Sequence, residues 1–289
     1  MPYTPGAALD GLRATLGDVA LGAVDSAGVA WRLQTLEGWD APDVRAEVTE
    51  REGDHGAWAS PVYLGARPIT LAGTIVAPSQ RQLEQAMDRL RVAAGLSDTL
   101  LTVWETTPKQ ALVRRSGKPL MQYVTDTTAT YSVMVTAADP RRYGTDLQTL
   151  TTGLPTVTGG LTLPATTPWL LSATTTDGLL QTVNEGDFET RPILTVTGPV
   201  LAPVIQAQMP AGHVRILTYS QDLADGDVLT IDTDAHSVIL NGDVSRRRFL
   251  AAPSGWPVIP AQSATTFFFT STAYNPTATL TATWRSAWQ

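Results

Sequence analysis

The sequence predicts a mainly β protein whose N-terminal part is α+β and contains the one clear helix. Short runs of alternating apolar and polar residues recur along the 289 residues, and Gly, Pro, Asn and Asp separate them. A single segment has the apolar period of a helix. With 43% hydrophobic and 16% charged residues, the chain can form one large or two ordinary domains, each with its own core.

The N-terminal half supplies the helix and several strands. Residues 68–76 (PITLAGTIV) alternate as a strand. Ser79 and Gln82 then have the spacing of a capping box, and apolar residues follow at i, i+4, i+7 and i+11 before Gly95, which predicts a helix of about four turns. Four more strands are predicted after it, at residues 99–104, 110–115, 120–124 and 129–137.

A domain boundary is expected where charge and strand periodicity both fade, from residue 145 to about 176. We therefore assign residues 1–150 to a first domain, 151–180 to a linker or the start of a second, and 181–289 to that second domain. The strands of this second domain are predicted to form a β-sandwich. They lie at residues 193–198, 213–219, 265–272 and 279–284, together with a hairpin within residues 227–244.

Residues 227–244 (DVLTIDTDAHSVILNGDV) raise the question of a metal site, because they hold four aspartates and a histidine. Two alternating runs on either side of Asp234 and Ala235 instead predict a β-hairpin, with the acids mainly at strand ends, where Asp favours turns. A calcium loop would need a closing Glu, and no Glu occurs after Glu189. The pattern favours a structural hairpin over a metal site.

The sequence offers little for catalysis, so we expect a non-enzymatic protein without metal or cofactor. It has no Cys and three His, and it contains none of the common hydrolase, zinc or nucleotide-binding motifs. A net charge of −7 argues against a protein that holds nucleic acid. No run approaches the roughly 20 apolar residues of a membrane helix, so we expect no membrane insertion.

Eight tryptophans leave a carbohydrate-binding module for bacterial cell-wall glycan as an alternative function, because exposed aromatic rings can stack on sugars. Three fall in strand-like runs and are expected in the core: Trp31, Trp104 and Trp284. Three lie in or near loops or the terminus, where they could bind a partner or cover a core edge: Trp58, Trp256 and Trp288.

The order of segments along nearly the whole chain resembles the distal tail proteins of siphophages, the Dit-like hub components of the phage tail and baseplate. In the first half the resemblance rests on WRLQTLEGWDAPDVR, GARPITLAGTIVAPS and AADPRRYG. In the second half it rests on VNEGDFETRPILTVTG, LADGDVLTIDTDAHSVILNG and ATLTATWRSAWQ. The order and spacing of these segments, rather than any one of them, carry the resemblance.

The resemblance implies a tail-tube-like β-sandwich with one flanking helix, followed by a galectin-like β-sandwich. It implies a structural virion protein, made in the host bacterial cytoplasm, that forms a homo-hexameric ring at the tip of a long non-contractile tail. The ring would continue the tube lumen for phage DNA, which passes without specific binding. Partners would be the tail-tube protein, the tape-measure protein and the tail-associated hub or receptor-binding proteins.

Two departures limit what the resemblance implies. The two halves leave no room for the carbohydrate-binding insertions of larger members, and the sugar-binding residues of galectins cannot be matched around His236, Asn241 and Trp256. The lectin activity is therefore not carried over. A tail-tube subunit is a further alternative, which the second sandwich disfavours because tube subunits need only the first.

One acidic stretch suggests a role in the channel. Residues 37–54 hold seven acids against Arg45 and Arg51. Since a conduit for DNA needs walls that do not hold phosphates, we hypothesise that some of these acids face the lumen or the ring above it. A solvated loop is the other interpretation. The candidate residues are Glu47, Glu50, Glu52 and Asp54.

Overall fold

The computed structural model describes residues 11–159, 173–176 and 178–289. These residues form two compact units, of which the first extends to Thr145 and the second comprises Asp146–Trp288. The prediction of a mainly β protein with one helix in its N-terminal part is confirmed. Among the described residues, no helix is long and apolar enough to cross a membrane.

The first unit is built on one antiparallel sheet with the strand order β2-β1-β10-β11-β13-β9-β4-β3. β9 and β13 pair over ten residues each, and along both strands the buried residues alternate with more exposed ones. The predicted strands of this half are confirmed. The strands are β1 (Arg13–Leu16), β2 (Val19–Leu21), β3 (Ala23–Val24), β4 (Ala30–Glu37), β9 (Arg67–Val76), β10 (Thr99–Trp104), β11 (Lys109–Arg115) and β13 (Thr128–Ala137), with β12 (Leu120–Thr125) on β13 and β14 (Arg142–Gly144) on β11.

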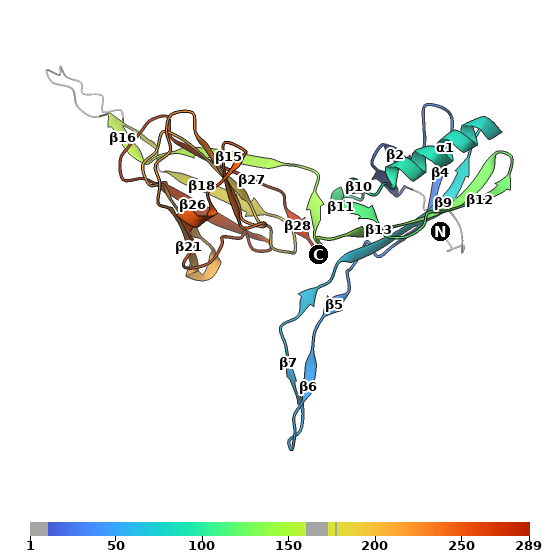
Figure 1. Ribbon diagram of the computed structural model, residues 1–289, viewed down its shortest axis with the longest axis horizontal. Helices are drawn as coiled ribbons and strands as arrows, with labels where there is room; N and C mark the ends of the chain where they lie inside the picture. The colour runs from blue at the N-terminus through green and yellow to red at the C-terminus, as the bar shows by residue number, and fades with distance from the viewer. Residues whose placement is uncertain (1–10, 160–172, 177) are drawn as a thin grey trace. The chain divides into compact units, whose positions relative to one another are not determined.

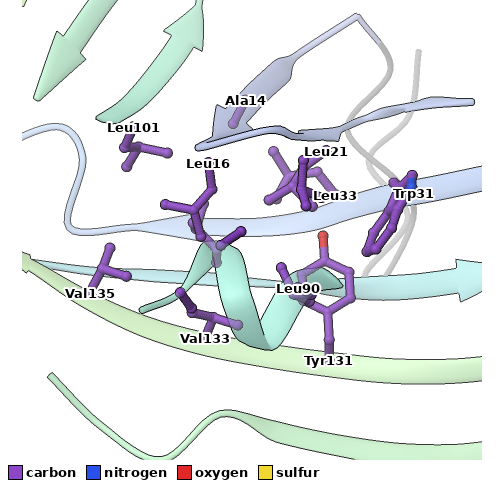
Figure 2. Packing of buried hydrophobic residues seen from close by; sticks show 14 of the residues in the cluster. Ala14, Leu16, Leu21, Trp31, Leu33, Leu90, Leu101, Tyr131, Val133 and Val135 are labelled. Carbon is purple, nitrogen blue, oxygen red and sulfur yellow. The ribbon is translucent and has the colours of Figure 1, made fainter. Parts of the chain in front are cut away.

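The helix α1 (Gln80–Ala93) supplies the other side of the core. Ser79 is its N-cap and accepts a hydrogen bond from the Gln82 backbone N–H, as the capping-box spacing predicts. The predicted apolar positions are all buried, and Figure 2 shows Leu90 in the same core cluster as Tyr131 and Val133 of β13. Trp31 is buried as expected, but the core prediction for Trp104 is wrong, because this side chain lies on the outer side of β10 and is 49% exposed.

The second unit is a sandwich of two antiparallel sheets, and its two-layer architecture fits the galectin-like prediction. One sheet has the order β15-β27-β19-β22-β23-β24 and the other β18-β26-β20-β21-β25. The predicted strands of this half are confirmed, and Trp284 is buried as expected. The elements are β15 (Gln148–Gly153), β18 (Leu179–Asn184), β19 (Ile193–Thr197), β20 (Val204–Gln208), β21 (Val214–Tyr219), β22 (Val228–Asp232), β23 (Ser237–Leu240), β24 (Val244–Ser245), β25 (Leu250–Ala251), β26 (Ser263–Thr270), β27 (Thr279–Trp284) and β28 (Ala287–Trp288), with 3-10 turns at Pro210–Gly212 and Arg247–Phe249.

The stretch expected to be a linker contains strands. β15 belongs to the first sheet of the sandwich, and β16 (Thr156–Gly159) pairs with β17 (Ala173–Thr176). Thr is a favourable strand residue, but a run rich in Thr does not alternate between apolar and polar side chains. The sequence of this stretch therefore showed no strand periodicity. The remaining expected linker, residues 160–172 and 177, lies outside the described residues. The boundary at residue 150 and the extent of the linker therefore stay predictions.

The hairpin prediction for residues 227–244 is confirmed, since β22 and β23 pair with Asp232 opposite Ser237. Asp232 accepts the backbone N–H groups of Asp234 and Ala235 at 2.8 and 2.9 Å and so closes the turn. Within the described ranges no group of three or more His, Asp or Glu side chains is placed to hold a metal ion.

Candidate interaction arm of the first unit

Between β4 and β9 the chain forms a long hairpin, which we call the arm (residues 38–66). Figure 1 shows it extending away from the sheet of its own unit. β5 (Val44–Arg45) pairs with β8 (Tyr63–Leu64), and β6 (Val48–Glu50) pairs with β7 (Ala57–Ala59). The register shifts by one residue between the two pairs, in the stretch that contains Pro61. The acidic stretch, for which a solvated loop was one interpretation, is therefore part of a two-stranded ribbon with a turn at its tip.

The arm has no core of its own. Its large apolar side chains are mostly exposed, from 61% to 67%: Val44, Val48, Trp58, Val62 and Tyr63. Beyond the point where the arm joins the sheet, the hydrogen bonds and the ion pair of the arm in the described structure stay within the hairpin. A shallow hollow of about 820 Å³ lies along the base of the ribbon, lined by Arg45, Glu47 and Tyr63 among others. An isolated two-stranded hairpin is only marginally stable in water, so this arm is suited to packing against a partner.

The four acidic residues singled out from the sequence all lie on the arm, and we call Glu47, Glu50, Glu52 and Asp54 the arm acids. All four are exposed. Glu47 and Glu50 are on the ribbon, while Glu52 and Asp54 are in its tip. Arg51 lies 3.9 Å from the Asp54 carboxylate and 4.5 Å above the Trp58 ring, so only Asp54 has a cation beside it in the described structure.

The arm is anchored by a buried arginine at the start of β9. Arg67 is 0% exposed. Its guanidinium donates to the carbonyl oxygens of Gly38 and Trp39, where the arm begins, and twice to Pro140, at 3.0 and 2.8 Å. Burial, and then the nearby charge of Arg142, lower the pKa of Arg67 to about 10, so it stays protonated at neutral pH. This side chain therefore joins both ends of the arm to the segment after β13.

A second layer of contacts holds Trp39. Its indole N–H donates to Glu105 at 2.6 Å, Glu105 pairs with Lys109 at 2.6 Å, and Arg142 lies 5.5 Å above the ring. Burial alone would raise the pKa of Glu105, but the hydrogen bonds from Lys109 and Trp39 outweigh it and hold that pKa below its usual value. The root of the arm is thus a charged, hydrogen-bonded cluster, in contrast to the exposed ribbon beyond it.

The face of the sheet opposite the core is partly exposed along its central strands β9 and β13, and no charged side chain of these two strands lies on it. On β9 and β13 the partly or fully exposed residues are mostly Thr and Ser, with Thr130 opposite Thr74 and Ser132 opposite Ala72. No Asp, Glu, Lys or Arg is on this face of these two strands. The first unit therefore presents a hydroxyl-rich strip without charge, flanked by Arg32 of β4 and Arg114 of β11, in addition to an acidic arm.

In the second unit the structure brings His236 of the hairpin turn against Trp256 of a separate loop. His236 stacks on Trp256 with ring centroids 4.6 Å apart and planes 11° apart, and Arg247 lies 4.9 Å from the same ring. Trp256 also packs against the core. Its ring is thus engaged by protein side chains, and the alternative in which it covers a core edge is supported over sugar stacking.

Arg67 is the functional side chain that sequence reasoning missed. The signal was present, because the three segments that carry the resemblance in this half each supply one part of the cluster: EGWD, GARP and ADPRR. Asn184, in the segment VNEGD, has the corresponding role of a buried anchor in the second unit. It is buried, donates to the carbonyls of Phe188, Ile259 and Pro260, and accepts the backbone N–H groups of Gly186 and Ala287.

Comparisons with known proteins agree with this architecture. A family model described as the C-terminal domain of the siphovirus-type tail component matches residues 185–288. No curated protein matches the chain. The solved structure of the SPP1 Dit (gp 19.1) protein, described as a paradigm of the hub adsorption apparatus in phages infecting Gram-positive bacteria, is 12% identical with a TM-score of 0.66, over 96% of this chain and 99% of that one. Two structures of the phage P2 baseplate in its activated conformation are more distant. The one with Ca is 10% identical (TM-score 0.46; 91% of this chain, 99% of that one), and the one with Sr is 10% identical (TM-score 0.49; 95% and 97%).

Proposed function

We propose that this chain is a Dit-like siphovirus tail component and that six copies of it form a ring at the tip of a long non-contractile tail. The match of residues 185–288 to the C-terminal domain of the siphovirus-type tail component supports this proposal. A tail component is part of the virion, and we propose that this one is made in the host cytoplasm. It acts as a structural protein and not as an enzyme. Tail-tube, tape-measure and receptor-binding proteins dock on the ring.

The exposed arm is the observation that carries the ring proposal. Its apolar side chains and marginal ribbon require a partner surface. A protruding element on one side of a subunit makes a head-to-tail contact, and such contacts stop growing only when they close into a ring. Closure also covers exposed strand edges that would otherwise pair with other chains.

The lumen proposal is supported by two surfaces of the first unit. The arm acids would repel DNA phosphates, and the exposed side chains of β9 and β13 themselves include no cation to hold them. Either surface allows DNA to pass without the counterion release that drives binding. The chain as a whole carries 20 basic and 27 acidic side chains, which fits a conduit better than a DNA-binding protein.

The test is the assembly state of the purified protein and of a variant without the ribbon. In that variant a short Gly-containing turn replaces residues 44–63, which leaves Arg67 and the root in place. We expect rings of the wild type in negative-stain images and monomers of the variant, with unchanged circular dichroism. A wild type that stays monomeric at all concentrations, or a ribbonless variant that still forms rings, would contradict the assembly role of the arm. A wild type that forms filaments would favour the tail-tube subunit, and monomers retained on cell-wall glycan would favour the carbohydrate-binding module.

A further inference from the structure

Four arginines gather around Trp256 and Phe249 in the second unit, and we call them the arginine patch: Arg215, Arg246, Arg247 and Arg248. The guanidinium of Arg248 lies 4.5 Å from the Phe249 ring centroid, and that of Arg246 5.7 Å from it. Arg247 lies on the Trp256 ring, and a Cβ added to the neighbouring Gly255 would meet Arg215 Nη1 at 3.1 Å. The four side chains therefore form one surface.

This surface lacks its own counterions. No described carboxylate forms an ion pair with any of the four arginines, and Arg247 and Arg248 are exposed. Asp227 acts on Arg246 through space, but its carboxylate already accepts hydrogen bonds from Asn241 and from the Ala224 N–H, each at 2.9 Å. Arg247 also donates a hydrogen bond to the Leu250 carbonyl oxygen at 2.9 Å. In a chain with a net charge of −7, four arginines without an ion pair beside two aromatic rings are a surface for an acidic partner.

The same chain carries a surface of the opposite charge. Three of the arm acids have no cation beside them in the described structure, and Val48 and Trp58 are exposed among them. The aromatic and aliphatic parts of the two surfaces can pack while their charges pair, which is the usual arrangement of a specific interface.

We propose that the arginine patch binds the acidic arm of a second copy of this chain. Each limb of the arm holds about 12 residues, which at about 3.3 Å per residue gives a reach of about 40 Å. A folded unit of this size has a radius of gyration of only about 15 Å. The tip therefore extends past the surface of its own unit and is available to another molecule. The inference rests on the proposed ring, because each copy would give one arm and receive one.

Charge reversal tests the contact on the full chain. The arm variant is Glu50→Arg with Glu52→Arg, and the patch variant is Arg247→Glu with Arg248→Glu. Each variant places like charges opposite one another, so we expect self-association measured by sedimentation velocity to weaken at least about tenfold. An equimolar mixture of the two variants should recover wild-type association, because every arm then finds a patch of opposite charge in an alternating ring.

Two double variants with the same charge changes at exposed sites of the first unit serve as controls. Arg81→Glu with Lys118→Glu matches the patch variant, and Asp18→Arg with Asp126→Arg matches the arm variant. Both controls should associate like the wild type. Circular dichroism of all variants checks that they fold.

The outcomes separate this inference from the proposed function. A wild type that never associates removes the ring and the contact together. A wild type that associates while both reversed variants do so equally well overturns the contact and leaves the ring standing. Variants that associate weakly and do not recover on mixing also overturn the contact between arm and patch, because the two surfaces then bind elsewhere. If the wild-type protein is retained on anionic vesicles through its arginine patch, the patch has a different occupant.

Discussion

Removal of the Arg67 guanidinium should destabilise the first unit and release the arm from its fixed direction. The substitution Arg67→Met keeps an unbranched apolar stem of similar length and removes all four hydrogen bonds to the Gly38, Trp39 and Pro140 carbonyls. The Met side chain fits the buried path of the arginine stem, so the change tests the bonds rather than the volume.

The magnitude follows from the carbonyls that lose a donor. Those of Trp39 and Pro140 make the short contacts, and a buried acceptor without a partner costs about 1–3 kcal/mol, or about 2–6 kcal/mol for the two. The variant also no longer buries a charge, and the relief of that desolvation offsets part of the loss. We expect a net decrease of about 2–3 kcal/mol in the free energy of unfolding of the first unit.

Urea unfolding followed by tryptophan fluorescence measures the change. Arg81→Met is the matched control, because Arg81 is exposed on α1 and Met is as good a helix former as Arg. The midpoint of this control should stay at that of the wild type. A decrease below about 1 kcal/mol for Arg67→Met would refute the role of Arg67 as the anchor. Arg67→Lys should restore little, since one ammonium cannot bond carbonyls on two separate segments as the guanidinium fork does.

Four further predictions test other parts of the molecule. Gly186→Ala should prevent stable folding of the second unit, because the new Cβ would lie 1.7 Å from the Ala287 carbonyl oxygen; thermal melting measures this. Asp25→Asn should cost about 1 kcal/mol near neutral pH by weakening the bond to Arg89. Burial would raise the pKa of Asp25, but its hydrogen bonds hold it below the ordinary 3.8, so the stability it contributes is lost as pH falls through that lowered pKa, and acid titrations of wild type and variant should converge there. Limited proteolysis should cut first between residues 145 and 180, and a first stable fragment boundary inside residues 60–140 would overturn the domain assignment. Lysine at all four arm acids should slow DNA ejection and create salt-sensitive DNA binding, whereas intact rings with unchanged ejection would rule out a channel role for these acids.

The sequence predicted those strands and the helix in which burial of one face imposes a regular spacing of apolar residues. β9 and β13 are ten residues long with one buried face, so their alternation was visible, and α1 was marked by its cap and apolar stripe. The arm is a ribbon without a buried face, so nothing forced its apolar residues into a pattern. β15 is rich in Thr, which suits a strand but gives no contrast between its two faces.

The candidate site divides in the same way. The acidity of residues 37–54 was visible in the sequence, because it is a local property, and it does mark the exposed arm. The anchor at Arg67 was not, because its partners are 28 and 73 residues away in the chain. The stack of His236 on Trp256 also joins separate loops, and neither residue alone indicated it.

The positions of Arg67 and Asn184 explain why a resemblance could indicate the family without indicating the partners. Both side chains are fully buried, and each bonds to the backbone of several segments. Loss of either side chain would leave buried carbonyls unpaired, and both residues lie in segments that carry the resemblance. Most of the arm and the arginine patch lie between or beside these segments, on exposed surface where only charge and reach are constrained. The resemblance therefore rests on segments around buried anchors, whereas the proposed contact between the arm and the arginine patch rests on exposed surfaces that the order of segments alone does not place.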